Sequence, residues 1–296
     1  MATAAGRITI LAAALGLTAA AVALPPNPTL SPRAPSTLQG PEVRVGNGTA
    51  RMFVELGPRG EPRALGIALT EAALTGLATH MNTTSRCFDK NGDGKVAHGE
   101  CLGDYQATLV LPAGATDLDL PVRWATVNWN PEGHLPPAPP VWSAAHFDFH
   151  FFMVEPALIQ GIRTGPCAEF IHCEDFARAS TPLPERHVPE GYIDVGAAVA
   201  AMGNHLVDAR DPELADPKLG FSRTFIYGAY DGKLVFLEPM VSHAFLSSRP
   251  QQCTPVRAPK AYAVAGYYPT NYCVRHDAAS ATYRVTLEGL VYRQAA

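Results

Sequence analysis

Residues 146–154 alternate between two kinds of side chain with a period of two, which predicts a β-strand whose two faces differ. One face carries three aromatic side chains suited to a core: Phe147, Phe149 and Phe151. The other face carries two imidazoles and a carboxylate: His146, Asp148 and His150. Such groups suit a transition metal such as zinc, copper, iron or nickel, and the sequence does not distinguish among these four.

The geometry of a straight strand limits how these three groups can share a metal ion. Same-face neighbours lie about 6.6 Å apart, and His146 lies about 13 Å from His150. Both histidines therefore bind one ion only if they lean together or the strand bends. The alternative is a solvated polar face or a hydrogen-bonded group in the core. We favour the metal because the face lacks the Ser, Thr or Lys typical of a solvated strand.

Two further residues are candidate ligands. His205 follows a glycine by two positions, and its alternative role is a turn histidine bonded to Asp208. Glu238 is the lone acid in an apolar strand, so it needs a partner as a ligand, general base or ion-pair member. His134, in a Gly/Pro turn, fits a site and a surface equally well. We expect four residues to converge in a barrel interior: His146, His150, His205 and Glu238. Asp148 would be a fifth ligand or an acceptor that orients an imidazole.

Residues 89–100 match the twelve-residue calcium loop of EF-hands. Gly94 occupies the turn position, and Lys95 offers its carbonyl. The predicted calcium ligands are Asp89, Asn91, Asp93, Lys95 and Glu100. The alternative is a Gly/Asp-rich surface turn, which would not require Glu100 at position twelve. No partner loop is present, so the motif indicates a structural calcium site rather than a paired sensor.

The chain has six cysteines, which predict three disulfides in an exported protein. Six cysteines allow fifteen pairings, and proximity along the chain favours Cys87–Cys101, Cys167–Cys173 and Cys253–Cys273. The first pair brackets the calcium loop, whose ends can lie farther apart than the roughly 7 Å Cα limit for a disulfide. Either the segments flanking the loop are not regular helices, or these two cysteines pair elsewhere.

The amino terminus has the features of a targeting segment. Residues 1–23 have a basic start, an apolar run and a small-residue cleavage site, which predicts a signal peptide. A single membrane anchor is the alternative, but the run is short and leads into Pro25 and Pro26. Residues 24–42 predict a disordered Pro-rich tether. We expect a periplasmic or extracellular protein with no stable membrane anchor, and the net charge of −4 argues against nucleic-acid binding.

Residues 43–296 predict a single β-rich domain with the calcium loop inserted at 87–101. The chain has 27 prolines and 25 glycines, which favour turns over long helices. Asp231-Gly232 between apolar runs predicts a hairpin over 225–238. Short helices are expected at 70–77 and 155–162. The fold class is therefore an antiparallel β-barrel or sandwich with a few short helices.

Four ordered blocks resemble a bacterial family of unknown function, the TTHB-two-ten-like domain family, whose namesake is a sigma-E-regulated protein. These blocks are residues 129–134, 146–151, 202–205 and 225–240. The resemblance covers residues 43 to 292 and implies an extracytoplasmic β-rich domain that self-associates. It implies no reaction, and the calcium loop is an insertion relative to the family pattern.

Two functions remain open from the sequence. The first is an exported metal-binding protein with a His/Glu transition-metal site and a separate structural calcium loop. The second is a mononuclear metalloenzyme, of hydrolase or oxygenase type, that uses the same site on an unknown substrate. A closed tetrahedral ligand set favours a structural role, and an open position beside a pocket favours an enzyme.

Overall fold

The computed structural model describes Met1, Ala34 and residues 36–134 and 140–296. Strands account for 47% of the chain and helices for 13%, which confirms the mainly β fold class. The predicted signal peptide and most of the predicted tether lie outside the described residues. Within the described part of the chain, no helix has the length and apolar character needed to cross a bilayer.

The first of two large sheets is antiparallel and has the order β1-β3-β4-β18-β17-β15, with β2 also paired to β3. Its strands are β1 (Ser36–Gln39), β2 (Val43–Val45), β3 (Gly48–Leu56), β4 (Pro62–Thr70), β15 (Gln251–Pro255), β17 (Asn271–Asp277) and β18 (Thr282–Glu288). Strand β1 corrects the predicted tether, since residues 36–39 pair with β3 instead of being disordered. Leu38 packs on the core from this strand, which explains why the ordered domain begins before residue 43.

The second large sheet is also antiparallel, in the order β11-β12-β13-β14-β9-β8-β7. Its strands are β7 (Tyr105–Val110), β8 (Trp124–Asn130), β9 (His146–Phe152), β11 (Tyr192–Val199), β12 (Gly203–Asp208), β13 (Arg223–Tyr230) and β14 (Lys233–Ser242). The predicted hairpin is confirmed as β13 and β14. Asp231 and Gly232 form its turn with φ of +53° and +69°, the left-handed values that such a turn requires.

Short elements connect the sheets. Two small pairs are β5 (Asn82–Cys87) with β6 (Cys101–Gly103) and β16 (Gly266–Tyr268) with β19 (Val291–Arg293), and β10 spans Thr164–Cys167. The α-helices are α1 (Pro156–Gln160), α2 (Cys173–Ala179), α3 (Pro212–Ala215) and α4 (His243–Ser247). The 3-10 helices are η1 (Glu71–Leu74), η2 (Pro140–Trp142), η3 (Glu185–His187) and η4 (Pro217–Leu219). Both predicted helices are present, but η1 and α1 are shorter than expected.

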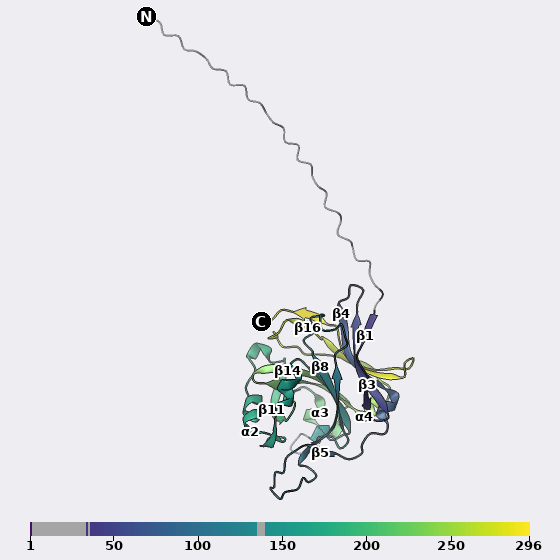
Figure 1. The fold of residues 1–296 in the computed structure, drawn as a ribbon, viewed down its shortest axis with the longest axis vertical. Coiled ribbons are helices and arrows are strands. Elements are labelled where there is room, and N and C mark those ends of the chain that lie inside the picture. The colour runs from purple at the N-terminus through teal and green to yellow at the C-terminus, as the bar shows by residue number, and fades with distance from the viewer. Residues whose placement is uncertain (2–33, 35, 135–139) are drawn as a thin grey trace. The chain divides into compact units, whose positions relative to one another are not determined.

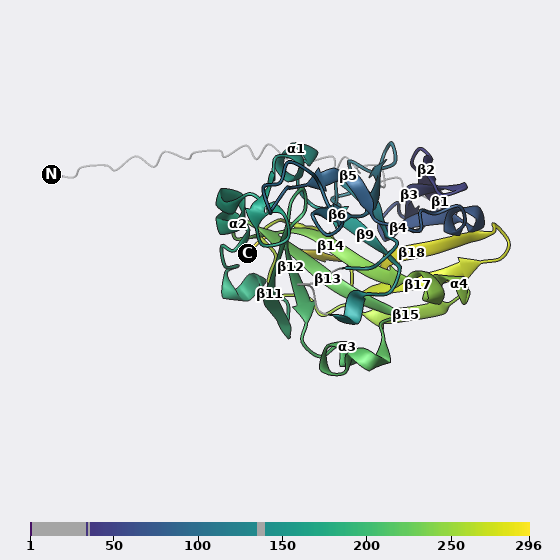
Figure 2. The same cartoon turned by 90° about the horizontal axis from the view of Figure 1, so that it is seen from below.

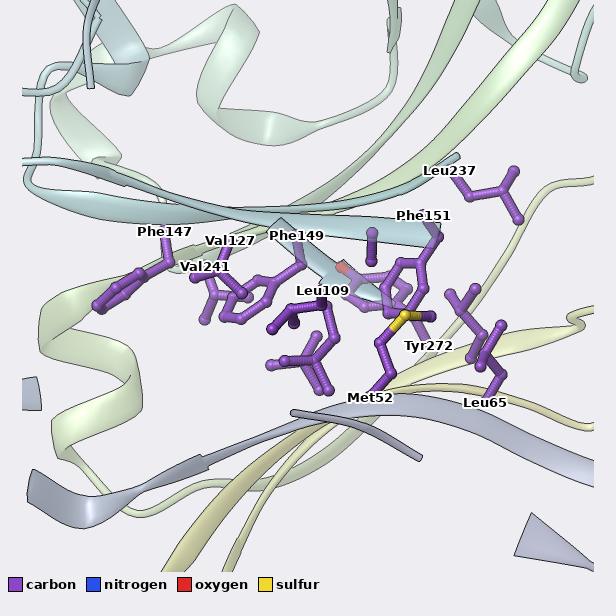
Figure 3. Close-up of a cluster of buried hydrophobic side chains, with 14 of the residues drawn as sticks. Met52, Leu65, Leu109, Val127, Phe147, Phe149, Phe151, Leu237, Val241 and Tyr272 are labelled. Atoms are coloured by element: carbon purple, nitrogen blue, oxygen red, sulfur yellow. The ribbon is translucent and has the colours of Figure 1, made fainter. Parts of the chain in front are cut away.

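The main core lies between the two large sheets (Figure 3). The three phenylalanines of β9 point into it and are fully buried, and they meet Met52 and Leu65 from the first sheet. Both large sheets keep open edges within the described residues, so the fold is a sandwich and not a closed barrel.

A second core covers the opposite face of the second sheet. Phe152 and Phe236 from that face pack with Ile159 of α1 and Ala179 of α2. Figure 2 shows α1 and α2 beside the strands of this sheet. The polar face of β9 therefore lies under this second layer and not between the two sheets.

All six cysteines are paired in the three expected disulfides. Cys87 and Cys101 face each other across β5 and β6, so strands and not helices flank the predicted calcium loop. This pairing removes the distance conflict raised by the sequence, because antiparallel strands hold the two ends of the loop together. The loop itself extends away from β5 (Figure 1). Three disulfides are typical of proteins that fold in an oxidising compartment.

Candidate metal centre

The polar face of β9 is buried despite its composition. His146 and His150 have no exposed surface, and Asp148 is 2% exposed. Opposite them on β8 lie three polar residues in register: Asn130, Asn128 and Thr126. Buried polar groups need partners, so the contacts of these side chains decide what the face can bind.

His150, His205 and Glu238 form one group, which we call the His150 group. Each offers one ligand atom, and the three atoms lie within 4.8 Å of one another. The Nε2 atom of His150 is 3.5 Å from one oxygen of Glu238, and the Nε2 atom of His205 is 3.7 Å from the other. Three different strands supply the group, namely β9, β14 and β12.

Adjacent strands and one glycine bring these residues together. His205 of β12 pairs with Gly228 of β13, which leaves the face open beside it. A side chain at Gly228 would collide with the ring of Phe236, since a Cβ there would lie 2.0 Å from that ring. Phe236 in turn contacts the rings of both His150 and His205. Phe236 thus forms an apolar wall on one side of the group, while His205 borders a cavity on another.

The spacing fits ligands around a metal better than it fits direct hydrogen bonds. Two ligands bound tetrahedrally at about 2.1 Å lie about 3.4 Å apart. The separations of 3.5 and 3.7 Å between the imidazoles and Glu238 are close to this value. Nitrogen–oxygen hydrogen bonds are shorter, at about 2.7–3.2 Å.

Several of the candidate ligand atoms have no hydrogen-bond partner in the described part of the chain. Both ring nitrogens of His150 and the Oε2 atom of Glu238 are buried and have no hydrogen-bond partner among the described residues. The Nδ1 atom of His205 is 2.8 Å from the carbonyl of Ala197. A carbonyl only accepts, so Nδ1 donates, and in the neutral ring the Nε2 atom keeps its lone pair toward Glu238.

Burial sets the charge of the group. Desolvation, partly offset by Asp148, lowers the pKa of His150 to about 3. Desolvation also lowers the pKa of His205. For Glu238, desolvation raises the pKa well above its usual value, and the charge of Asp148 adds to this. The group thus has two neutral imidazoles and a carboxyl whose ionised form is unfavourable in this buried site. A divalent cation bound here would stabilise the ionised carboxylate.

The four residues predicted to converge, with Asp148 as a fifth ligand or an orienting acceptor, fall into two groups. His150, His205 and Glu238 meet, but His146 and Asp148 lie with His134 in a separate group, which we call the His146 group. The expectation of one shared ion is therefore wrong. On a straight strand the two histidines lie roughly 13 Å apart, and their ligand atoms belong to different groups. The expected barrel interior is also wrong, because both groups lie under the second core.

A third set of possible ligands is Cys253, Cys273 and Glu288. The two cysteines form a disulfide, so their sulfurs are not available as thiolates. This set is therefore structural.

The predicted calcium loop is stabilised by its own backbone. Oxygens of Asp89 accept hydrogen bonds from the amides of Gly92 and Gly94, and Asp93 accepts one from Lys95. Both oxygens of Glu100 accept backbone amides from residues 90, 91 and 97. The loop carboxylates are not among the groups of the described residues whose ligand atoms lie within 4.8 Å. Calcium binding at this loop stays a prediction.

One cavity of about 140 Å³ connects these features. His205 from the His150 group lines it, as do His134 and Asp148 from the His146 group. Lys90 from the predicted calcium loop and Phe170 from the segment between β10 and α2 lie on its wall. The cavity thus reaches both groups of candidate ligands.

Comparisons with models of protein families, with curated proteins and with solved structures find no match to this chain. The resemblance to the TTHB-two-ten-like domain family stays a prediction. The function is therefore argued from the site alone.

Proposed function

We propose that this protein is an exported metal-binding protein in which His150, His205 and Glu238 hold one transition-metal ion. One observation carries the proposal: the imidazole of His150 is fully buried, and neither of its nitrogens has a partner within the described residues. An unpaired buried polar group costs about 1–3 kcal/mol. A metal ion would give one ligand atom of each of His150, His205 and Glu238 a partner.

The competing explanation is a neutral hydrogen-bonded cluster. A protonated Glu238 can donate to only one imidazole at a time. Its separations of 3.5 and 3.7 Å from the two rings are long for such a bond.

A mononuclear metalloenzyme is the second candidate. Two histidines and one carboxylate leave coordination positions open, as in non-haem iron oxygenases and catalytic zinc sites. The observation that favours it is the cavity beside His205, which gives a small molecule a route to the group. A metal bound there would supply an activated water or a binding site for dioxygen. His205 and Glu238 would then hold the metal ion in place beside the cavity.

Elemental analysis of the natively exported protein tests metal binding. We expect the purified chain to carry a transition metal and His205→Ala to lose one equivalent. His276→Ala is the matched control, because His276 is equally buried and its Nε2 atom pairs with a Glu71 oxygen at 2.7 Å. Equal metal content in His205→Ala, His276→Ala and the parent chain would refute the site.

We also propose that the loop over residues 89–100 binds calcium as a structural ion. The order of its oxygen donors supports this, together with the disulfide that holds its two ends. Export to the periplasm or the exterior is proposed from the predicted signal peptide and the three disulfides. Self-association is proposed from the family resemblance alone.

A further inference from the structure

We propose that His134, His146 and Asp148 form a second, separate transition-metal centre on the same sheet face. Their ligand atoms lie within 4.8 Å of one another. This centre does not depend on the His150 group, because the two groups share no residue. The chain would accordingly hold two transition-metal ions.

The distances within the His146 group lie on both sides of the spacing expected for metal ligands. The Nε2 atom of His146 is 3.1 Å from Asp148 Oδ1 and 3.3 Å from the Nε2 atom of His134. His134 lies 3.9 Å from the other oxygen of Asp148. Ligands of a tetrahedral ion with bonds of about 2.1 Å are about 3.4 Å apart.

The hydrogen bonds of His146 direct a lone pair into the group. Its Nδ1 atom is 2.6 Å from the carbonyl of Ala144, which can only accept, so Nδ1 carries the proton. In the neutral ring, Nε2 then faces the oxygen of Asp148 and the nitrogen of His134 without a proton of its own. Metal-binding imidazoles typically donate their other nitrogen to a carbonyl in this way.

Asp148 supplies the independent evidence of a missing partner. Its Oδ2 atom accepts a hydrogen bond from Asn130 Nδ2 at 2.7 Å, which fixes the carboxylate. Its Oδ1 atom is buried and has no hydrogen-bond partner in the described parts of the chain, despite the nearby imidazole of His146. An ion pair with a charged His146 would instead place an N–H in line with this oxygen. With Nδ1 of His146 protonated, the 3.1 Å contact leaves the Oδ1 atom of Asp148 available as a metal ligand.

The local fold explains how His134 reaches the strand. It follows the turn after β8, where Gly133 has a φ of +68°. A Cβ at Gly133 would lie 2.4 Å from backbone atoms of Trp142 and Ser143, so only glycine permits this close approach. The amide of His134 then donates to the carbonyl of Trp142 at 2.9 Å.

The two centres are neighbours but are not bridged. Asp148 and His150 are same-face neighbours on β9, about 6.6 Å apart. Metal pairs that share a ligand lie about 3.5–4 Å apart. Both centres have a residue on the cavity wall, His205 for one and His134 for the other. Each metal ion would keep an open coordination position toward this cavity, so one small molecule in the cavity could reach both ions.

Zinc stoichiometry tests this proposal. The full-length mature protein, with its disulfides intact, is stripped with a chelator and titrated with zinc in excess calcium. We expect two zinc ions per parent chain and one per His134→Ala chain. The double variant with His205→Ala should bind none. Asp148→Asn keeps the shape of the side chain and should also bind one, which separates ligand loss from misfolding.

The matched control is His172→Ala, since the His172 side chain is exposed to a similar degree, at 37% against 29% for His134. It should bind two zinc ions. If His134→Ala and Asp148→Asn bind as much zinc as the parent chain, the second centre does not exist. If instead His134→Ala loses one ion while His205→Ala loses none, this centre stands and the proposed site at His150 fails.

Discussion

Replacing Glu238 by glutamine should stabilise the metal-free protein at neutral pH, although Glu238 is a proposed ligand. The side chain is 1% exposed, and burial raises its pKa well above the usual value. The folded chain therefore keeps the proton of Glu238 at a pH where the unfolded chain has released it. Because the folded state binds more protons, the free energy of unfolding falls as the pH rises above the unfolded pKa of about 4.3. Glutamine does not titrate and removes this loss.

The magnitude follows from proton linkage. While Glu238 stays protonated only in the folded state, each pH unit lowers the stability by about 1.4 kcal/mol. Above about pH 5 the parent chain should therefore lose stability relative to Glu238→Gln with each pH unit, until Glu238 ionises in the folded state. No reduction for solvent screening applies, because the carboxyl is buried.

Zinc should reverse the order of stability. A ligand at one hundred times its dissociation constant adds about 2.7 kcal/mol to the folded state. The parent chain provides a carboxylate to the ion, whereas Glu238→Gln provides only a neutral amide. The variant should consequently be the more stable protein in chelator and the less stable one in zinc.

Urea unfolding at several pH values, in chelator and in excess zinc, measures both effects. Glu169→Gln is the control, since burial also raises the pKa of Glu169 but this residue is outside both ligand groups. It should share the direction of the pH effect and leave the zinc effect unchanged. A difference between Glu238→Gln and the parent that does not vary with pH would show that the carboxyl is ionised in the fold, and the reasoning would be wrong.

Three other perturbations test separate parts of the molecule. Glu100→Gln should abolish the rise in melting temperature with added calcium, because position twelve supplies the bidentate ligand. If neither calcium nor chelator changes the melting curve of the parent chain, the loop is only a surface turn. Replacing both Cys87 and Cys101 by serine should lower the free energy of unfolding by about 3 kcal/mol for this separation of 14 residues, and free thiols in mass spectra of the exported protein would contradict the disulfide. Phe149→Ala should cost about 3–5 kcal/mol in chemical unfolding without changing zinc stoichiometry, since Phe149 is buried on the opposite face of β9.

Local patterns in the sequence predicted the elements well. The alternation of residues 146–152 fixes which side chains share a face, because a strand repeats every two residues. The turn at Asp231-Gly232 is also local, and it fixes the pairing of β13 with β14. The three disulfides join cysteines 6 to 20 residues apart, so proximity along the chain was sufficient to pair them.

The arrangement of the sheets depended on contacts between distant segments and was not predicted. An alternating strand indicates an apolar and a polar face, but not what covers each of them. Here the phenylalanines of β9 meet the first sheet, and the polar face is covered by α1, α2 and their connections. The segments that bury the polar face are short and have little hydrophobic periodicity, so the sequence did not reveal them. A barrel interior was therefore predicted as the place where this face is buried.

The division of the candidate ligands into two groups follows from a distance already present in the sequence. Residues His146 and Asp148 are two positions apart, about 6.6 Å, and their side chains can lean together onto one ion. His146 and His150 are four positions apart, about 13 Å, which two side chains cannot close around bonds of about 2.1 Å on a flat strand. The partners at each end must then come from elsewhere: His134 from the turn after β8, and His205 and Glu238 from strands beyond β9. A histidine–aspartate–histidine alternation on a buried strand therefore predicts two neighbouring sites more readily than one. A histidine that follows a glycine with positive φ, as His134 follows Gly133, is the residue to test as the missing ligand.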